Sequence, residues 1–416
     1  MEHTIKMKSD RTTWFGQRSF CFGFTQHCIT LALASFLLCI GRDTIVAKEA
    51  IQNAGQAKNL TETLRHEGVE RTYHIHLPPG FSKDKPAPLV FALHGGGGEG
   101  RRFDQSTTQG TLTAAADKRG VVLVFPEGIN KQWCDGRTAM LKTKKTYDDV
   151  GFISEIIDTM VKNYNIDPTR VYATGISNGG FMSVRLAMDL SEKIAAVAPV
   201  TAQIPKALKD KTPKLPISIM IVNGTKDPLV PFGGGHIRLF RSGRSRGEIL
   251  STASTVDHFR RHNGCGKTAD KSKLQDKNPD DGTNVEIEKY TDGKDGTEVV
   301  LVKVIGGGHT WPSGKQYLSP RLVGTVCRDI NASEMILNFF LRHSRKEHSV
   351  RYLPINRRSR PRRYAVPRQG AQQTDSRHAR EVPAAQEISS YFLRTCSRLD
   401  FTAFRLGRNS ASYSLS

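Results

Sequence analysis

The chain has 416 residues, of which 38% are hydrophobic and 24% charged, enough for one large domain or two ordinary ones. It has no run of 18 or more apolar residues, which excludes a protein that crosses a membrane several times. Nearly half of the net charge of +21 lies in residues 344–416, which carry 15 basic and 5 acidic residues. The charge therefore says little about the fold or the partners of the remainder.

The first 50 residues have the pattern of an export signal with a short leader. Four basic residues come first: Lys6, Lys8, Arg11 and Arg18. The apolar run Ile29–Ile40 follows, with the length of a signal-peptide core and not of a membrane span. We predict cleavage within 41–50, near Ala47, and a secreted or periplasmic mature protein. The alternatives are an uncleaved membrane anchor and a lipoprotein attached at Cys39, which large preceding residues disfavour.

Seven cysteines occur, and three of them lie in the expected signal region. The other four are Cys134, Cys265, Cys327 and Cys396. Export permits disulfides, and we expect one bridge within the first three of these, although the sequence leaves the pairing open. No spacing of Cys and His typical of a metal site occurs, so we predict no metal ligands.

Apolar strands alternate with helices from about residue 70 to 343. The expected strands are 72–77, 88–93, 121–125, 170–174, 195–200, 217–222, 285–290 and 299–304. The expected helices are 112–118, 149–164, the segment from Gly175 to Leu190, 251–262 and 333–343. Short, continuously apolar strands between helices are typical of a mostly parallel sheet covered on both faces. We predict one α/β domain at 51–343, with 270–296 as a surface excursion.

Residues 344–416 differ from the rest of the chain. They contain the arginine-rich stretch 357–363, then a segment rich in Gln, Ser and Ala. Such a composition buries too little apolar surface to offset the entropy of ordering, so we predict a disordered tail. We expect its positive charge to attract anionic polymers.

The segment Gly175–Gly179 has the pattern G-x-S-x-G and joins an expected strand to an expected helix. This is the context of a nucleophile elbow, in which glycines permit a tight turn that exposes the serine hydroxyl. We therefore predict Ser177 as a nucleophile. The alternative is an ordinary strand-to-helix turn with a capping serine.

A serine nucleophile needs a base, usually a histidine that a carboxylate orients, in the chain order Ser, Asp or Glu, His. Asp227 follows the apolar strand 217–222, and His309 follows the strand 299–304 and three glycines. We predict the triad Ser177, Asp227 and His309. The structural alternatives are a turn aspartate and a histidine without catalytic function.

Backbone amides must also stabilise the oxyanion. One donor is expected at Asn178, the residue after the nucleophile, and the second in the loop His94–Gly98. We predict Gly96 as this second donor, with Gly97 as the alternative. The glycines match neither phosphate-binding pattern, so we expect no nucleotide.

Several segments match a known family. They are LPPGF (77–81), LHGGGG (93–98), DDVGFI (148–153), YNIDPTRVYATGISNGG (164–180), NGTKDPLVPF (223–232), HNGC (262–265) and GGGHTWP (306–312). Residues 65–343 thereby resemble the secreted esterases of the polyhydroxybutyrate depolymerase group, which adjoin the feruloyl and acetylxylan esterases. The resemblance implies an α/β-hydrolase fold, serine esterase activity without a cofactor, and the triad roles given above.

The chain departs from this family in two ways. A cysteine usual near Tyr290–Gly293 is missing, which leaves Cys265 without its expected partner and Cys327 as a substitute candidate. No polymer-binding module is attached, which argues against a role on insoluble polymer. Trp311 and Trp133 are predicted to shape the substrate pocket, with core packing as the alternative.

We therefore predict an exported serine esterase that acts on hydroxybutyrate-type oligoesters, with an ester, possibly polymeric, as its partner. Feruloyl or acetylxylan esters of plant polysaccharide are the alternative substrates, and a serine peptidase is a more distant one. The alternative from another class is a non-catalytic secreted polymer-binding protein. We expect no specific nucleic-acid partner, and the sequence leaves the oligomeric state open.

Overall fold

The computed structural model describes residues 55–137, 146–238 and 243–346. The expected signal peptide, Cys396 and all but the first three residues of the expected tail lie outside this part. The chain divides into two units, 1–350 and 351–416, and all described residues belong to the first. None of the helices within the described ranges is long and apolar enough to cross a membrane.

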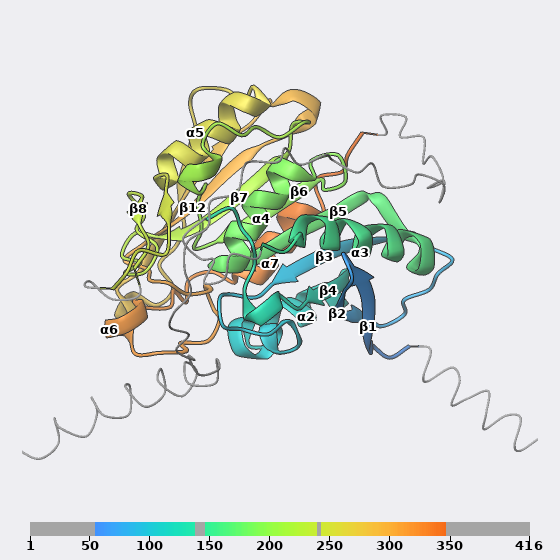
Figure 1. Cartoon of the computed structure of the whole chain (residues 1–416). Helices are drawn as coiled ribbons and strands as arrows, with labels where there is room; N and C mark the ends of the chain where they lie inside the picture. Colours follow the sequence, from blue (N-terminus) through green and yellow to red (C-terminus); the bar gives the residue numbers. More distant parts are fainter. Residues whose placement is uncertain (1–54, 138–145, 239–242, 347–416) are drawn as a thin grey trace, which may run out of the picture. The chain divides into compact units, whose positions relative to one another are not determined.

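One sheet of ten strands organises the described residues. The strands are β1 (Lys58–His66), β2 (Val69–Leu77), β3 (Ala87–Leu93), β4 (Val122–Pro126), β5 (Ile166–Ile176), β6 (Ala196–Val200), β7 (Ser218–Gly224), β10 (Asp270–Lys273), β11 (Asn284–Tyr290) and β12 (Val299–Ile305). Their spatial order is β1-β2-β4-β3-β5-β6-β7-β12-β11-β10 (Figure 1). The pairs from β4 across to β12 are parallel, and those at both edges are antiparallel. The predicted mostly parallel centre of the sheet is confirmed.

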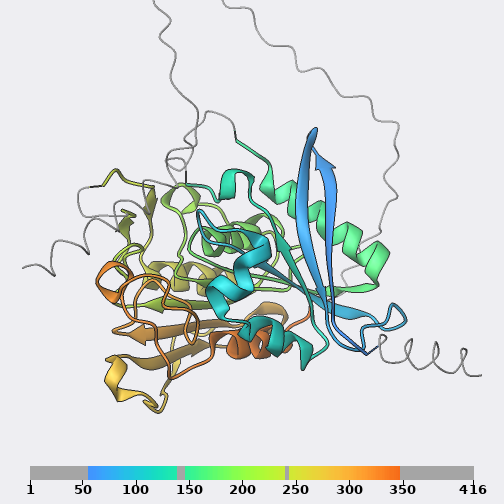
Figure 2. The ribbon, with the colours of Figure 1, turned by 90° about the horizontal axis from the view of Figure 1, so that it is seen from below.

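Helices cover both faces of this sheet. The α-helices of the described ranges are α2 (Thr111–Asp117), α3 (Asp149–Tyr164), α4 (Asn178–Asp189), α5 (Thr252–Asn263), α6 (Pro320–Val323) and α7 (Ala332–Phe340), and all except α6 contribute to the clusters on these faces. One buried cluster joins the sheet to α3, α4 and α5, with Phe152, Met182 and Phe259 among its members. A second cluster joins the opposite face to α2 and α7 through Leu112 and Phe340. Figure 2 gives a second view of the two layers.

The strands at the centre are apolar because both of their faces are covered. Every residue of β3 and of β7 is buried, as expected for strands between two helical layers. The expected strands and helices are all present, with boundaries shifted by a few residues.

The sequence analysis missed the elements that carry little apolar surface. Most of β1 is exposed and its sequence, KNLTETLRH, has no buried run, yet it pairs with β2 along its whole length. The strand β10 is exposed throughout. The short pair β8 (Gly235–His236) and β9 (Glu248–Ile249) forms a separate two-stranded sheet. Edge pairing, and not apolar periodicity, defines these strands.

The predicted end of the domain at His343 lies too early. The amide of Arg345 donates to the Thr169 carbonyl over 2.9 Å, and the Lys346 ammonium lies 3.0 Å from Asp295. These residues therefore pack on the domain, and its boundary lies no earlier than residue 346.

The expected disulfide is wrong for the described cysteines, because Cys134, Cys265 and Cys327 are all free thiols. Cys265 is buried, and a β-carbon built on Gly293 would lie 2.8 Å from its Sγ. The position facing Cys265 is thus within the segment where the resemblance places the missing cysteine. With glycine there, the thiol packs without a covalent partner.

Candidate active site

The turn from β5 into α4 holds Ser177 in a strained conformation. Its φ is 55° and its ψ is −118°, a region that non-glycine residues rarely adopt. A β-carbon on Gly179 would overlap the Leu93 carbonyl, and one on Gly175 would meet Gly179. The two glycines of the motif therefore allow the close backbone packing that a nucleophile elbow requires.

Neighbouring strand ends are joined at the carboxyl edge of the sheet. Backbone hydrogen bonds of 2.9 Å run from Ser177 N to Val200 O, from Thr201 N to Val222 O, and from Thr225 N to Val304 O. The loops that carry Ser177, Asp227 and His309 thus begin side by side along one edge, where open α/β sheets place their functional groups.

Asp227 and His309 form a buried pair. His309 Nδ1 lies 2.7 Å from Asp227 Oδ2, and the exposed fractions of the two residues are 5% and 8%. The other carboxylate oxygen accepts from the amides of Leu229 and Val230, each over 2.8 Å. Because these amides fix the carboxylate, its second oxygen faces the imidazole. Because its partner is a carboxylate, His309 carries its ring proton on Nδ1, and Nε2 is available as a base.

Contacts from residues 317–323 hold the loop of His309. The His309 amide donates to the Val323 carbonyl over 2.6 Å, and the Tyr317 hydroxyl donates to the His309 carbonyl over 3.1 Å. Burial, and secondly the charge of Asp227, raise the pKa of Tyr317, so its hydroxyl remains a donor. The sequence analysis missed Tyr317, because no local motif links it to His309.

The glycine loop after β3 lies beside the elbow. A β-carbon on Gly96 would lie 3.7 Å from the Asn178 β-carbon. The Gly97 amide donates to the Lys131 carbonyl over 2.8 Å, and the Gly98 amide donates to Gly95 over 2.9 Å. Within the described part of the chain, no hydrogen bond uses the amides of Gly96 and Asn178. Of the two predicted alternatives, Gly96 therefore has the free donor.

His94 fixes the shape of this loop. Its Nε2 accepts from the Gly128 amide over 3.0 Å, so the ring proton is on Nδ1, which donates to the Gly95 carbonyl over 2.8 Å. Burial lowers the pKa of His94, which favours this neutral form. The sequence analysis treated His94 only as the start of the loop.

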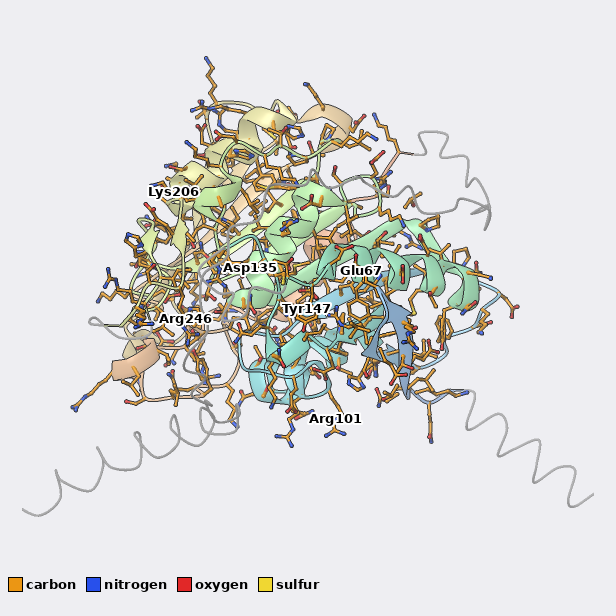
Figure 3. All side chains as sticks on the ribbon, in the orientation of Figure 1. Glu67, Arg101, Asp135, Tyr147, Lys206 and Arg246 are labelled. Atoms are coloured by element: carbon orange, nitrogen blue, oxygen red, sulfur yellow. The ribbon has the colours of Figure 1, made fainter. Side chains whose placement is uncertain are left out.

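Hydrogen bonds of the Asn178 side chain link the first turn of α4 to the segment after β4. Its Oδ1 accepts from the Trp133 amide over 2.8 Å, and its Nδ2 donates to Asp135 Oδ2 over 2.6 Å. Asp135 in turn forms a buried ion pair with Arg137. Figure 3 shows Asp135 near the centre of the view.

The two tryptophans predicted to contact substrate are core residues in this structure. The exposed fraction is 1% for Trp311 and 2% for Trp133. Trp311 packs edge-on against Phe103 at 5.8 Å, and the Trp133 indole donates to the His94 carbonyl over 2.9 Å. This burial favours core packing, the alternative that the sequence analysis left open. Gln132 instead lies against Gly96, within 3.5 Å of the position of a β-carbon there.

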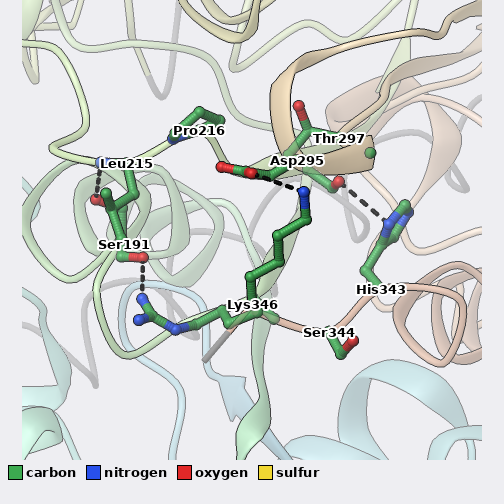
Figure 4. A pocket seen from close by; sticks show the side chains of 12 residues that line it. Ser191, Leu215, Pro216, Asp295, Thr297, His343, Ser344 and Lys346 are labelled. Atoms are coloured by element: carbon green, nitrogen blue, oxygen red, sulfur yellow. Dashed lines mark hydrogen bonds and ion pairs between the residues drawn. The ribbon is translucent and has the colours of Figure 1, made fainter. Parts of the chain in front are cut away.

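The described residues contain no group of three or more His, Cys, Asp or Glu side chains that could hold a metal ion. Two hollows lie away from the candidate site. One, of about 30 Å³, is lined by residues that include Ser191 and Leu215, whose Oγ and amide form a hydrogen bond, and the ion pair of Lys346 with Asp295 (Figure 4). The other, of about 290 Å³, lies between α5 and the strands β11 and β12. Neither is lined by Ser177, Asp227 or His309.

Comparisons with known proteins find esterases. Residues 65–228 match the profile of a family described as "Putative esterase". The chain is 32% identical over 282 residues to "Putative esterase NocK" of Nocardia uniformis subsp. tsuyamanensis, covering 66% of this chain and 80% of the relative. It is 29% identical over 252 residues to "Feruloyl esterase B" of Piromyces equi, covering 58% of this chain.

The chain spans 43% of the length of the Piromyces equi protein, less than half of it. Among solved structures, it is similar to an acetyl xylan esterase from Aspergillus awamori, with a TM-score of 0.43 and 14% sequence identity. That similarity covers 60% of this chain and 94% of the other.

Proposed function

The chain belongs to the esterase family, with an α/β-hydrolase fold, and from this membership we propose that it hydrolyses carboxylic esters through Ser177, His309 and Asp227. One observation carries the assignment. The buried Asp227–His309 pair lies at the same sheet edge as the strained serine elbow. A non-catalytic polymer-binding protein has no need for this combination.

The first half of the proposed reaction forms an acyl-enzyme. His309 Nε2 takes the proton of the Ser177 hydroxyl as Oγ attacks the ester carbonyl carbon. The carbonyl π-electrons move to oxygen, and the amides of Gly96 and Asn178 stabilise the resulting oxyanion. As the tetrahedral intermediate collapses, the C–O bond to the alcohol breaks and His309 gives its proton to the leaving oxygen.

The second half releases the acid. Water attacks the acyl carbon while His309 Nε2 accepts its proton, and a second tetrahedral intermediate forms. On collapse, the bond to Ser177 Oγ breaks and the proton passes from His309 to the serine. Asp227 stays ionised throughout and stabilises the imidazolium that forms twice in each cycle.

The surface beside His309 supports an ester with an apolar part. Tyr317 and Leu322 are each 41% exposed, on the same segment whose Val323 carbonyl binds the His309 amide. Large apolar side chains exposed together at a site favour contact with apolar ligand surface. We propose that these two residues, and not the buried tryptophans, contact the substrate.

Two substrate classes fit this surface. A feruloyl ester is favoured by the name of the Piromyces equi relative, and its aromatic ring is suited to packing on Tyr317. A hydroxybutyrate-type oligoester is favoured by the sequence motifs. Acetylated xylan remains the third candidate.

We further propose that the chain is exported and that the basic tail, residues 347–416, binds anionic polymer.

A substrate panel tests the proposal. The purified chain is assayed on p-nitrophenyl acetate and butyrate, methyl ferulate, acetylated xylan and hydroxybutyrate oligomers, with the Ser177→Ala variant as the control. We expect turnover of the short p-nitrophenyl esters and a clear preference among the natural classes. Absence of turnover on every ester, or equal activity of the Ser177→Ala variant, would overturn the proposal.

A further inference from the structure

The segment that contains β8 and β9 packs against the first turn of α4. Ile237 and Ile249 share a buried cluster with Phe181, one turn after the elbow serine, and with Val230, close to Asp227. This segment is therefore anchored beside two of the loops that form the candidate active site.

Arginines are concentrated in the same segment. Four arginines, Arg238, Arg241, Arg244 and Arg246, lie within nine residues of the sequence, and no acidic residue separates them. Arg244 is exposed, whereas Arg246 is partly buried.

Arg137 lies between this segment and the first turn of α4. Its guanidinium carbon lies 4.1 Å from the centroid of the Phe181 ring. A β-carbon on Gly247 would lie 3.0 Å from Arg137 Cβ, so the backbone next to Arg246 packs on the Arg137 side chain. Asp135 pairs with Arg137 and also accepts from the side-chain Nδ2 of Asn178. The backbone beside Arg246 thus packs on Arg137, whose partner Asp135 also binds the side chain of Asn178, the residue after the elbow serine.

The charge of Arg246 is not compensated by any carboxylate within the described ranges. Asp135 is occupied by Arg137 and Asn178. Glu248, the nearest acidic residue along the chain, pairs with Lys206 over 2.6 Å. Burial, and secondly the nearby charge of Arg137, lower the pKa of Arg246. A guanidinium nonetheless remains protonated in a protein.

A partly desolvated cation without a partner is unfavourable, and an anionic ligand would relieve that cost. The guanidinium presents two parallel N–H donors that match the two oxygens of a carboxylate. We propose that Arg246 binds a carboxylate group carried by the ester substrate, so that the enzyme selects esters with one anionic end over their neutral analogues. This inference rests on the proposed esterase function.

Two matched substrate pairs test the inference at constant ionic strength. The first is the linear dimer of 3-hydroxybutyrate and its methyl ester, which places the carboxylate on the alcohol half. The second is 4-methylumbelliferyl hydrogen adipate and 4-methylumbelliferyl hexanoate, which places it on the acyl half. Each is assayed with the wild type, with Arg246→Gln, and with Arg244→Gln, which removes the same charge from an exposed position.

We expect Arg246→Gln to lower kcat/KM at least tenfold for the charged member of one pair, mainly through KM. The neutral member should change less than twofold, and Arg244→Gln should behave as wild type on both pairs. Arg246→Lys should recover part of the preference, because it restores the charge but not the bidentate geometry.

If Arg246→Gln and Arg244→Gln lowered kcat/KM for the charged esters equally, the preference would come from long-range charge, and the inference would be overturned. So would equal losses on charged and neutral members, or no loss on either charged ester. Normal turnover of the neutral esters in these cases would leave the esterase function intact. If the wild type failed to hydrolyse all four esters, the proposed function itself would be wrong.

Discussion

The serine elbow and the histidine loop are held in place by different means. The elbow, residues 175–180, depends on its own glycines, which fit a strained turn against the neighbouring strand. The loop of His309 depends on side chains and carbonyls from later residues, among them Tyr317 and Val323. A local motif therefore encodes the first region, and tertiary contacts encode the second.

This difference explains what the sequence could predict. The order of the α/β elements could be predicted because buried strands are apolar runs. The placement of Ser177, Asp227 and His309 on loops that follow such strands could be predicted for the same reason, whereas their catalytic roles stay a prediction. The positions of Tyr317 and Gln132 at the candidate site, and the role of His94, could not be predicted from the sequence. Each of these residues acts through a contact with another segment of the chain. The two tryptophans adjoin site motifs in sequence, yet the structure buries them.

The largest expected effect comes from removing the base. His309→Ala should reduce kcat by several orders of magnitude, up to about 10⁶-fold, because Ser177 then has no proton acceptor. The measurement is kcat on p-nitrophenyl butyrate. The melting temperature should stay within a few degrees of the wild-type value. A loss below tenfold would place the base elsewhere.

Asp227→Asn should reduce kcat by roughly four orders of magnitude, because an amide at this position favours the wrong imidazole tautomer. Ester kinetics measure this directly, with Asp257→Asn as the control for loss of a negative charge away from the pair. Wild-type turnover by Asp227→Asn would contradict the assignment of Asp227 as the orienting carboxylate.

Gly179→Ala tests how strictly the elbow depends on its glycine. The added methyl group would overlap the Leu93 carbonyl, and we expect a loss of about 3 kcal/mol in the free energy of unfolding together with most of the activity. Gly266→Ala is the matched control, because no atom lies within 4 Å of its β-carbon position. Denaturant unfolding compares the two. Equal stability would show that the elbow tolerates a side chain.

Tyr317→Phe tests the histidine loop in the same way. It removes one hydrogen bond to the His309 carbonyl and keeps the exposed ring. We expect kcat to fall about fivefold, the effect of about 1 kcal/mol from a single hydrogen bond, with little change in KM. A large rise in KM with unchanged kcat would instead assign Tyr317 to substrate binding alone.

The smallest effect concerns pH and His94. Its pKa is lowered in the folded chain, so the unfolded chain binds the extra proton first as pH falls below about 6.5. The His94 contribution to stability is therefore present above this pH and lost below it. His94→Asn should show a weaker fall in the free energy of unfolding between pH 7 and pH 5. An unchanged slope would mean that His94 does not contribute to the acid sensitivity.

The nucleophile is the central claim, and covalent labelling tests it most directly. A fluorophosphonate probe should modify the folded wild-type chain at one position, identified as Ser177 by peptide mass spectrometry. The Ser177→Ala variant should remain unlabelled and inactive while keeping its melting temperature. Labelling of a different residue, or ester turnover by Ser177→Ala at the wild-type rate, would contradict the account.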